Sequence, residues 1–346
     1  MSSSPHARPP LELPPCDDRR IWEVWMQAYQ FPTLCVADEM GLFTLLERSP
    51  LTADQVASEL TLSPRAAESL VGVLTGLGFL VQHGGRFQIT EVTRHFLLPS
   101  SPYYWGGMLR FVRDIPITRE ALQGVLAKDR PRDGTMDEMW EAHEMKPEMA
   151  RAFTSAMHSR SLHLGVAAAR RVPEFAGVRR LLDVAGGSGC FSIALAQRHP
   201  QMRCTVLELA QVAKLAQGYI AEFGLADRVV THVADMFADP WPAGHDAAFF
   251  SNIYHDWDRA RCLHLTRKTF DALPREGRVF IHEVLLSDTK DAPLVGITDS
   301  MHMMFFTEGK QRTAGEFESI LAEAGFRDMT VTPTYAYYSV VQARKP

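Results

Sequence analysis

The residues in this chain best suited to chemistry are a run of glycines that follows a short apolar stretch. Asp183-Val184-Ala185-Gly186-Gly187-Ser188-Gly189 comes directly after Leu181-Leu182, and a helical pattern follows at 191–197. Glycines at a strand-to-helix turn let a ligand approach the main chain, and the first N–H groups of the helix are free to bind it. The spacing is not the G-x-G-x-x-G of a dinucleotide site. The turn predicts a site for a nucleotide-like cofactor, while an ordinary loop or another ligand's site stays open as an alternative.

Two acidic residues further along occur where recognition of a nucleoside would need them. Glu208 ends the second expected strand, and a carboxylate there can accept hydrogen bonds from both hydroxyls of a ribose. Asp235 follows the third expected strand, where it can accept from an adenine amino group while Met236 lies on the ring. Each residue alone is equally well explained as a solvated acid or a core methionine. Three such features in this order favour the cofactor site.

Several segments together resemble known methyltransferases. The pattern D-x-A-x-G-x-G at 183–189 is close to the D-x-G-x-G-x-G of class I S-adenosylmethionine (AdoMet) methyltransferases. Asn252-Ile253-Tyr254-His255-Asp256-Trp257 looks like the L-H-D-W segment of the plant-type O-methyltransferase family, which includes acetylserotonin O-methyltransferase and bacterial natural-product enzymes. Other matches are the F-x-x-x-M helix at 153–157, the post-strand glutamate at 281–283, the T-E-G-x-E-R-T turn at 307–313 and Ala324-Gly325-Phe326.

This resemblance implies an AdoMet-dependent O-methyltransferase that acts on a hydroxyl of a small aromatic secondary metabolite and releases S-adenosyl-L-homocysteine. By the resemblance, His255 is the general base, Glu283 orients its imidazole, and Asp256 belongs to the same catalytic group. A base whose pKa is near neutral suits removal of a phenolic proton. A lone histidine is more often structural, but its place in this motif favours the catalytic role.

The resemblance also assigns two sets of binding residues. The cofactor set is Ser161, Asp183, Ala185, Gly187, Glu208, Asp235, Met236 and Ser251. The acceptor set is Phe153, Met157, Asn252, His302 and Phe306.

The chain departs from the family's pattern at several of these positions. The first motif glycine is Ala185, which is tolerable if the backbone angle there is ordinary. The second supporting glutamate, in E-R-T, is Gln311, which carries no charge. A lysine often found four residues before the base is Ser251, which weakens that contact with the cofactor. His302 stands where acetylserotonin-type sequences have Asn.

His302 leaves a different enzyme open. A branch of the same fold uses two histidines to hold iron while it methylates carbon next to a keto acid, and His255 could pair with His302 in this way. Two histidines are few for a metal, so substrate would have to complete the ligand shell; we assign no metal ligand. Rearrangement with AdoMet is a further alternative, against which the intact His255-Asp256 pair argues. The non-enzyme alternative is a ligand-sensing regulator.

The first hundred residues predict helices followed by a hairpin. Apolar residues at helical spacing indicate two helices within 21–46, and Thr52 and Ser63 begin two more as caps. The segment 79–89 predicts a hairpin around Gly84-Gly85, which completes a winged-helix unit.

DNA binding is disfavoured for this winged helix. Arg65 is the one basic residue of the expected recognition helix, and Glu68 lies beside it. The charge pattern therefore favours a dimerisation or substrate-lid module. The family resemblance implies a homodimer formed through this domain, with apolar surface from Trp22, Trp25, Phe31 and Phe43.

From Gly177 onward, strands alternate with helices. The alternation predicts an α/β fold with a parallel, Rossmann-like sheet covered by helices on both faces and a ligand beyond the strands' carboxyl ends. The expected division is a flexible arm at 1–16, the winged-helix domain at 17–104, a mainly helical linker and substrate wall at 105–172, and the AdoMet-binding domain at 173–346. The expected strands are Arg180–Val184, Cys204–Leu209, Val229–Ala234, Ala247–Ile253, Arg278–Leu285, Met329–Pro333 and Tyr338–Ala343.

Composition excludes other classes. The chain has 346 residues, enough for two domains, and a formal net charge of −5 with a pI of about 6.2, which does not favour nucleic acid or an anionic membrane. Its 5 cysteines are scattered without a C-x-x-C pair, as expected of reduced thiols. Neither a signal peptide nor an apolar run of about eighteen residues occurs. We expect a cytoplasmic protein whose partners are a small acceptor molecule and a second copy of the chain.

Overall fold

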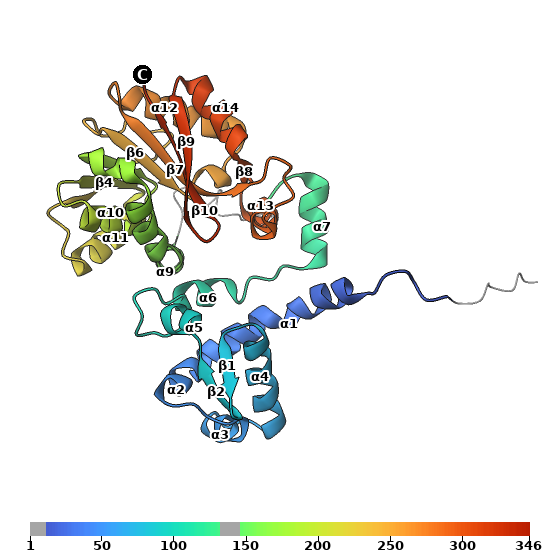
Figure 1. Cartoon of the computed structure of the whole chain (residues 1–346). Coiled ribbons are helices and arrows are strands. Elements are labelled where there is room, and N and C mark those ends of the chain that lie inside the picture. Colours follow the sequence, from blue (N-terminus) through green and yellow to red (C-terminus); the bar gives the residue numbers. More distant parts are fainter. Residues whose placement is uncertain (1–11, 132–145) are drawn as a thin grey trace, which may run out of the picture. The chain divides into compact units, whose positions relative to one another are not determined.

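The structure, a computed structural model, describes residues 12–131 and 146–346, which divide into two compact units (Figure 1). The first unit extends to Pro99, and the second begins at Ser100. Most of the expected flexible arm, 1–16, lies outside the described residues. Each unit buries apolar side chains of its own.

The first unit has the predicted order of helices followed by a hairpin. Thr52 and Ser63 accept hydrogen bonds from backbone N–H groups in the first turns of their helices, as N-caps do. Gly84 and Gly85 have positive φ and form the hairpin turn. The elements are α1 (Arg19–Glu39), α2 (Leu42–Arg48), α3 (Ala53–Glu59), α4 (Pro64–Gly76), β1 (Leu80–His83), β2 (Arg86–Ile89) and α5 (Glu91–Phe96).

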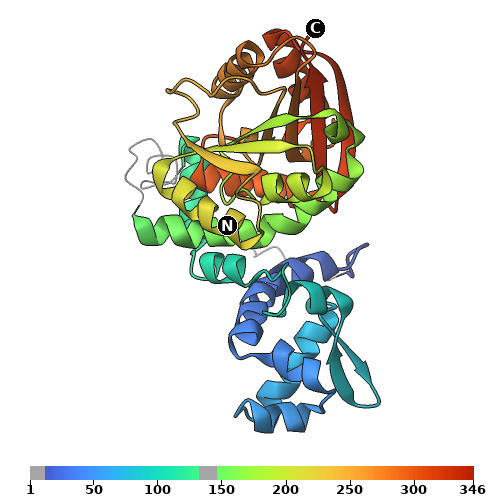
Figure 2. The same ribbon diagram turned by 90° about the vertical axis from the view of Figure 1, so that its left-hand side faces the viewer.

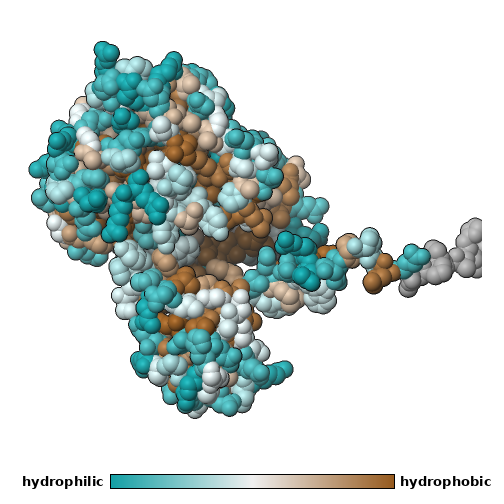
Figure 3. Space-filling model, viewed as in Figure 1, coloured by the Kyte–Doolittle hydropathy of each residue, from teal (hydrophilic) through white to brown (hydrophobic). Residues whose placement is uncertain are grey.

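Helix α1 exposes large apolar side chains, and some of the apolar surface of the unit is visible in Figure 3. Trp22, Trp25 and Phe31 are 52%, 56% and 41% exposed. Phe43 was expected to share this surface, and that prediction is wrong. It is 1% exposed, because the first turn of α2 points it into the core of the unit.

The second unit is built on an eight-stranded sheet within the described residues. Its strands follow the order β5-β4-β3-β6-β7-β10-β9, and β8 pairs with β7. The pairs from β5 to β7 are parallel, as predicted. The strands are β3 (Arg180–Val184), β4 (Arg203–Glu208), β5 (Val229–Val233), β6 (Ala247–Ser251), β7 (Arg278–Leu286), β8 (Arg312–Thr313), β9 (Arg327–Tyr335) and β10 (Tyr338–Arg344).

The sheet differs from the prediction at three places. β10 runs antiparallel to both β7 and β9, because the short connection from β9 to β10 permits only a hairpin. β8 was not predicted, since two residues carry no pattern. β6 ends at Ser251 rather than at Ile253 because Asn252 takes a φ of 54°. Glu283 lies inside β7, within the expected strand Arg278–Leu285.

Helices cover both faces of the sheet (Figure 1, Figure 2). Leu181 and Phe249 face a core shared with α9, α10 and α11, whereas their neighbours Leu182 and Phe250 face a core shared with α12 and α14. This alternation is what strands buried on both sides require. The helical segments are α6 (Gly106–Val112), α7 (Arg119–Lys128), α9 (Pro147–Arg171), η1 (Pro173–Gly177), α10 (Cys190–Arg198), α11 (Ala210–Glu222), η2 (Tyr254–Asp256), α12 (Arg259–Ala272), α13 (Leu294–Phe306) and α14 (Ala314–Ala324).

The sheet order places a ligand-binding edge near its centre. The chain moves outward from β3 through β4 to β5 and then returns to the other side of β3 with β6. At such a switch point the connections after β3 and β6 leave a crevice between them at the carboxyl ends of the strands. None of the described helices combines the length and the apolar character needed to cross a bilayer.

Candidate active site

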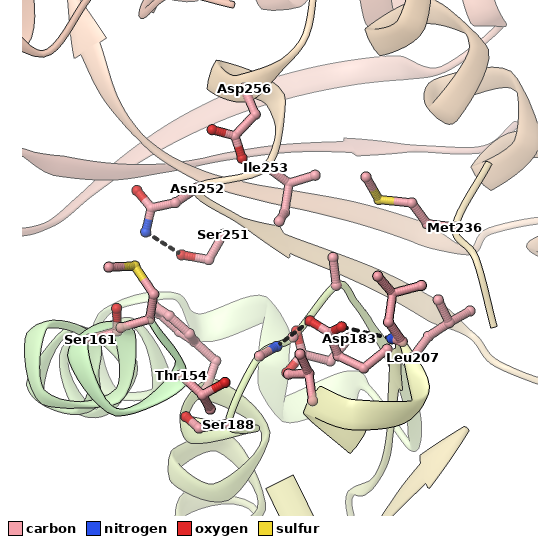
Figure 4. A pocket seen from close by; sticks show the side chains of 18 of the residues that line it. Thr154, Ser161, Asp183, Ser188, Leu207, Met236, Ser251, Asn252, Ile253 and Asp256 are labelled. Carbon is pink, nitrogen blue, oxygen red and sulfur yellow. Dashed lines mark hydrogen bonds between the residues drawn. The ribbon is translucent and has the colours of Figure 1, made fainter. Parts of the chain in front are cut away.

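A pocket opens at the carboxyl ends of β3, β4 and β6, within the second unit. Figure 4 shows Thr154 and Ser161 of α9 on one side of it and Met236 on the opposite side. Many of the predicted site residues line this pocket: Phe153, Met157, Ser161, Asp183, Ala185, Gly187, Glu208, Asp235, Met236, Ser251, Asn252 and Asp256. His255, Glu283, His302 and Phe306 do not line it.

Asp183 packs against the glycine turn and contacts Gly186 and Ser192. Its carboxylate is buried and accepts a 2.6 Å hydrogen bond from the hydroxyl of Ser192 on α10. A Cβ on Gly186 would lie 2.6 Å from the Asp183 carboxyl carbon, so this position requires glycine. Burial raises the pKa of Asp183 to about 6. Asp183 therefore braces the turn, and the backbone of the turn faces the pocket.

Ala185 does not have the ordinary backbone angle on which its tolerance was expected to depend. Its φ is 51°, in the left-handed region, and its N–H donates a 2.9 Å hydrogen bond to the carbonyl of Leu207. An L-residue in this region has a Cβ too close to a neighbouring carbonyl oxygen. The turn thus keeps the geometry suited to glycine, and alanine adopts it with strain.

Glu208 connects the ends of two strands. One carboxylate oxygen accepts from the N–H of Gly187 at 3.0 Å, and the other accepts from the N–H of Leu209 at 2.8 Å. Burial is the main cause that raises the pKa of Glu208 to about 7. Each oxygen retains a second lone pair, so the carboxylate can still accept from a vicinal diol.

The residues at this end of the pocket fit AdoMet. Gly187 has a φ of 57°, and a Cβ placed on it would meet open space, so a ligand can lie directly against the main chain. Asp235 is held by the N–H groups of Phe237 and Ala238, which both donate to its Oδ1. Together with Met236 and Glu208, which line the same pocket, Asp235 offers acceptors for a ribose and an adenine and an apolar surface for the ring.

His255 lies directly behind the pocket wall in the turn η2. Its neighbours Asp256 and Trp257 line the pocket, whereas His255 is 5% exposed. Glu283 positions this turn, because its Oε1 accepts the N–H groups of Ile253 and Tyr254, both at 3.1 Å. The imidazole is thereby held at one place beside the pocket.

Burial sets the protonation of His255 and Glu283. Glu283 Oε2 is 3.4 Å from Nδ1 of His255, and Asp256 Oδ1 is 3.5 Å from Nε2. Burial lowers the pKa of His255 to about 4 despite the opposing charge of Asp299. Burial also raises the pKa of Glu283 to about 8, against the charge of Arg312. At neutral pH, the imidazole and the carboxyl are both uncharged.

Gln311 changes the hydrogen bonding of this imidazole. Its amide nitrogen lies 2.7 Å from Nδ1 of His255 and 2.6 Å from Oδ2 of Asp299. An amide nitrogen donates to both, which makes Nδ1 an acceptor and leaves the ring proton on Nε2, toward Asp256. A glutamate at this position would instead accept from Nδ1–H. The substitution therefore inverts the tautomer that the family pattern favours.

His302 and Phe306 form a pair on α13, with ring centroids 4.7 Å apart. Burial lowers the pKa of His302, and its charge is one of the influences that lower the pKa of His255. Across residues 12–131 and 146–346, no group of three or more His, Cys, Asp or Glu side chains is arranged to hold a metal ion.

Other lining residues were not singled out from the sequence. Phe237 follows Met236 directly, and Trp257 belongs to the same motif as His255, so adjacency was a usable signal for both. Ser188 and Leu207 also line the pocket. Asp299 had no motif, and its contact with Gln311 depends on the packing of α13.

Comparison with known proteins places these features in a family. A model described as the O-methyltransferase domain matches residues 131–327, and one described as the O-methyltransferase dimerisation domain matches residues 22–99. The chain is 37% identical over 300 residues to a 3-hydroxy-5-methyl-1-naphthoate 3-O-methyltransferase of Streptomyces sahachiroi, which covers 85% of each chain.

Two further comparisons concern a C-methyltransferase and a solved structure. An L-tyrosine C(3)-methyltransferase of Streptomyces lavendulae is 30% identical over 358 aligned positions, covering 100% of this chain and 98% of its own. The crystal structure of human N-acetylserotonin methyltransferase in complex with SAM shares the fold with a TM-score of 0.79 at 23% identity, over 96% of this chain and 99% of that one.

Proposed function

Because this chain belongs to the O-methyltransferase domain family and is an AdoMet-dependent methyltransferase, we propose that it methylates a hydroxyl of a small aromatic secondary metabolite. The observation that carries the proposal is the placement of His255 directly behind the acceptor side of a pocket whose other side fits AdoMet. The relative from Streptomyces sahachiroi is named for 3-O-methylation of a hydroxynaphthoate, a reaction of this type.

The cofactor residues have separate tasks in this proposal. When bound, AdoMet supplies an electrophilic methyl group on a sulfonium. Glu208 binds the ribose, Asp235 and Met236 bind the adenine, and the backbone at Ala185 and Gly187 lies along the ligand. Asp183 supports the turn through Ser192. Ser161 and Ser251 complete the wall, where Ser251 is itself held by a 3.0 Å hydrogen bond with His282.

His255 acts as the base for the acceptor hydroxyl. Glu283 orients it by anchoring the turn, and Asp256 links Nε2 to the pocket. Proton removal at Nε2 requires the ring proton to move to Nδ1. There the Nδ1–H donates to Glu283 once Glu283 is ionised, and the Gln311 amide turns so that its unpaired oxygen, not its nitrogen, faces Nδ1. Alignment of the oxygen with the methyl group supplies the rest of the acceleration. Phe153, Met157 and Asn252 form the acceptor wall of the pocket. His302 and Phe306, on α13, lie outside its lining and would contact the acceptor only if it extends to them.

Methyl transfer from isotopically methyl-labelled AdoMet to a panel of hydroxylated arenes tests this function. We expect label in an aryl methyl ether, identified by the carbon shift of its methyl group. Absence of transfer to every hydroxyarene in the panel would contradict the proposal.

Transfer to carbon is the second candidate, because a relative that spans the whole chain is named as an L-tyrosine C(3)-methyltransferase. In that reaction His255 would remove a ring proton or polarise the phenol, with or without a metal at His255 and His302. The product of the same labelled assay distinguishes the two, since a C-methyl group has a different carbon shift from an ether. Loss of activity with a chelator, restored by iron, would assign the metal-dependent form.

The remaining proposals concern assembly. The dimerisation-domain match and the exposed α1 residues support a homodimer formed through the segment 17–104, with 105–172 as linker and substrate wall. Trp22→Glu with Trp25→Glu should shift the mass in solution from dimer to monomer. Leu13→Glu, at another exposed apolar residue, is the control.

A further inference from the structure

A half-buried arginine on α9, Arg160, has no part in the roles above. Arg160 lies seven residues after Phe153 and three after Met157, so the three side chains share one face of the helix. Phe153 and Met157 line the pocket. The same face therefore presents a guanidinium next to two residues of the acceptor wall.

Charged groups of the reacting centre act on Arg160 through space. Burial alone would lower its pKa, yet the pKa of Arg160 is raised because Tyr338, Asp299, Asp256 and Glu283 act on it through space. These four residues come from β10, α13, η2 and β7. The charge of Arg160 in turn contributes to the lowered pKa of His255.

No described residue pairs with this guanidinium. Arg160 forms no hydrogen bond and no ion pair with any residue in 12–131 or 146–346, and its Nε is buried without a partner. Asp299 is engaged by Gln311, and Glu283 by two backbone N–H groups. Buried charged groups in proteins are normally paired. A half-buried guanidinium whose Nε is buried without a partner, on the helix face that carries Phe153 and Met157, is therefore a site for an anion that arrives with the ligand.

We propose that Arg160 binds a carboxylate of the acceptor, which makes the acceptor a hydroxylated aromatic carboxylic acid. This inference rests on the proposed O-methylation. The planar guanidinium donates two parallel N–H groups to a carboxylate, a pairing that fixes direction as well as charge. Anchored at Arg160, the ring has one orientation across Phe153 and Met157, and this orientation selects which hydroxyl reaches Asp256 and His255.

The ionised acceptor hydroxyl is a second anionic oxygen that could meet Arg160. Removal of the arginine distinguishes the two anionic groups, because each predicts a different set of acceptors whose binding or turnover is reduced. If the partner is a ring carboxylate, only acids lose binding. If it is the reacting oxygen, acids and simple phenols lose turnover equally.

Binding and turnover of 3-hydroxy-2-naphthoate and 2-naphthol by Arg160→Met, Arg160→Lys and wild type separate these sources. Binding is followed by naphthol fluorescence in the presence of S-adenosylhomocysteine. We expect Arg160→Met to weaken binding of the acid about 10- to 100-fold and to leave 2-naphthol unchanged. Arg160→Lys keeps the charge without the fork and should fall between. Arg170→Met, at an exposed arginine of the same helix, is the control.

Two results overturn the inference: equal losses for the acid and the naphthol, or no preference of the wild type for the acid. A thermal melt of Arg160→Met shows whether it folds, and Arg160→Lys carries the test if it does not. The binding assay requires no methyl transfer, so arginine-dependent binding without any methylated product would contradict the proposed function and leave this inference standing. If instead the acid is methylated equally well by wild type and Arg160→Met, the proposed function stands and this inference is contradicted.

Discussion

The cofactor side of the pocket and its acceptor side are built from different kinds of contact. On the cofactor side, Asp183, Glu208 and Asp235 each follow or end a strand, and their hydrogen bonds go to backbone N–H groups or to the adjoining helix. On the acceptor side, His255 meets Gln311 and Glu283, which come from distant parts of the chain. The first arrangement depends on main-chain geometry, and the second depends on which side chains several elements supply.

The chain departs from its family's pattern on both sides of the pocket, with different consequences. Strand ends of a parallel sheet stay at one edge whatever their side chains are, so Ala185 and Ser251 leave the arrangement of the cofactor side in place. On the acceptor side, Gln311 changes the hydrogen bonding of His255 directly and also contacts Asp299.

Replacement of His255 should give the largest effect on activity, and it should affect the acceptor side of the pocket without affecting the cofactor side. We expect His255→Ala to lower kcat about 10²- to 10⁴-fold, because a positioned base contributes on that scale. The Kd for AdoMet, measured by calorimetry, should stay within twofold. His83→Ala, at an exposed histidine of the first unit, is the control. An unchanged kcat would exclude proton removal by His255.

Replacement of Glu208 should show the opposite pattern. Glu208→Gln keeps the shape but removes one of two accepting oxygens, so the Kd for AdoMet should rise about 10- to 100-fold. At saturating cofactor, kcat for the acceptor should change little. Glu222→Gln, at the exposed end of α11, should leave both values unaltered. A large fall in kcat at saturation would mean that the two sides are not separable.

The pH dependence tests the pairing of His255 with Glu283. The raised pKa of Glu283, about 8, means that its carboxyl is neutral below that pH and becomes a carboxylate beside Nδ1 above it. Ionisation strengthens the base, so kcat of the wild type should rise as pH increases through about 8. Glu283→Gln still accepts the two backbone N–H groups but should lack this rise.

The free energy of unfolding should fall with increasing pH, whereas kcat should rise. Because the native carboxyl of Glu283 holds its proton more tightly than the unfolded one, the free energy of unfolding should decrease as pH rises from about 4.5 to about 8. Urea unfolding at pH 6 and pH 8 measures the decrease, which Glu283→Gln should reduce. A decrease of equal size in both proteins would place the ionising group elsewhere.

The smallest expected effect concerns the strained alanine of the cofactor side. Ala185→Gly should increase the free energy of unfolding by about 0.5–1 kcal/mol, since left-handed backbone disfavours an L-residue by slightly more than glycine loses in entropy. Ala221→Gly, at an exposed helical position, should instead decrease it by about 1 kcal/mol. Destabilisation by both substitutions would show that Ala185 is not strained.

Sequence reasoning reached most of the fold and the cofactor side. Periodicity, caps and turn glycines depend on neighbours in the chain, so the hairpin at Gly84-Gly85, the helices begun by Thr52 and Ser63 and the strand ends near Asp183 and Glu208 were predicted. The prediction failed for Phe43, because an apolar residue on a short helix carries no sign of which face is covered. It also failed for the antiparallel direction of β10, because the pairing of β10 with β7 and β9 is a long-range contact that the sequence of β10 does not reveal.

The sequence by itself determined the family, the α/β sheet and the order of acidic residues along its edge, because local backbone preference and motif spacing are written in consecutive residues. Only the tertiary structure decided the φ of Ala185, the hydrogen bond from Gln311 to His255 and the position of Arg160 without a partner. The first depends on the pairing of β3 with β4, through the hydrogen bond from Ala185 to Leu207, and the other two depend on side chains from separate elements. Contacts of that kind join residues far apart in the chain, and no local pattern records them.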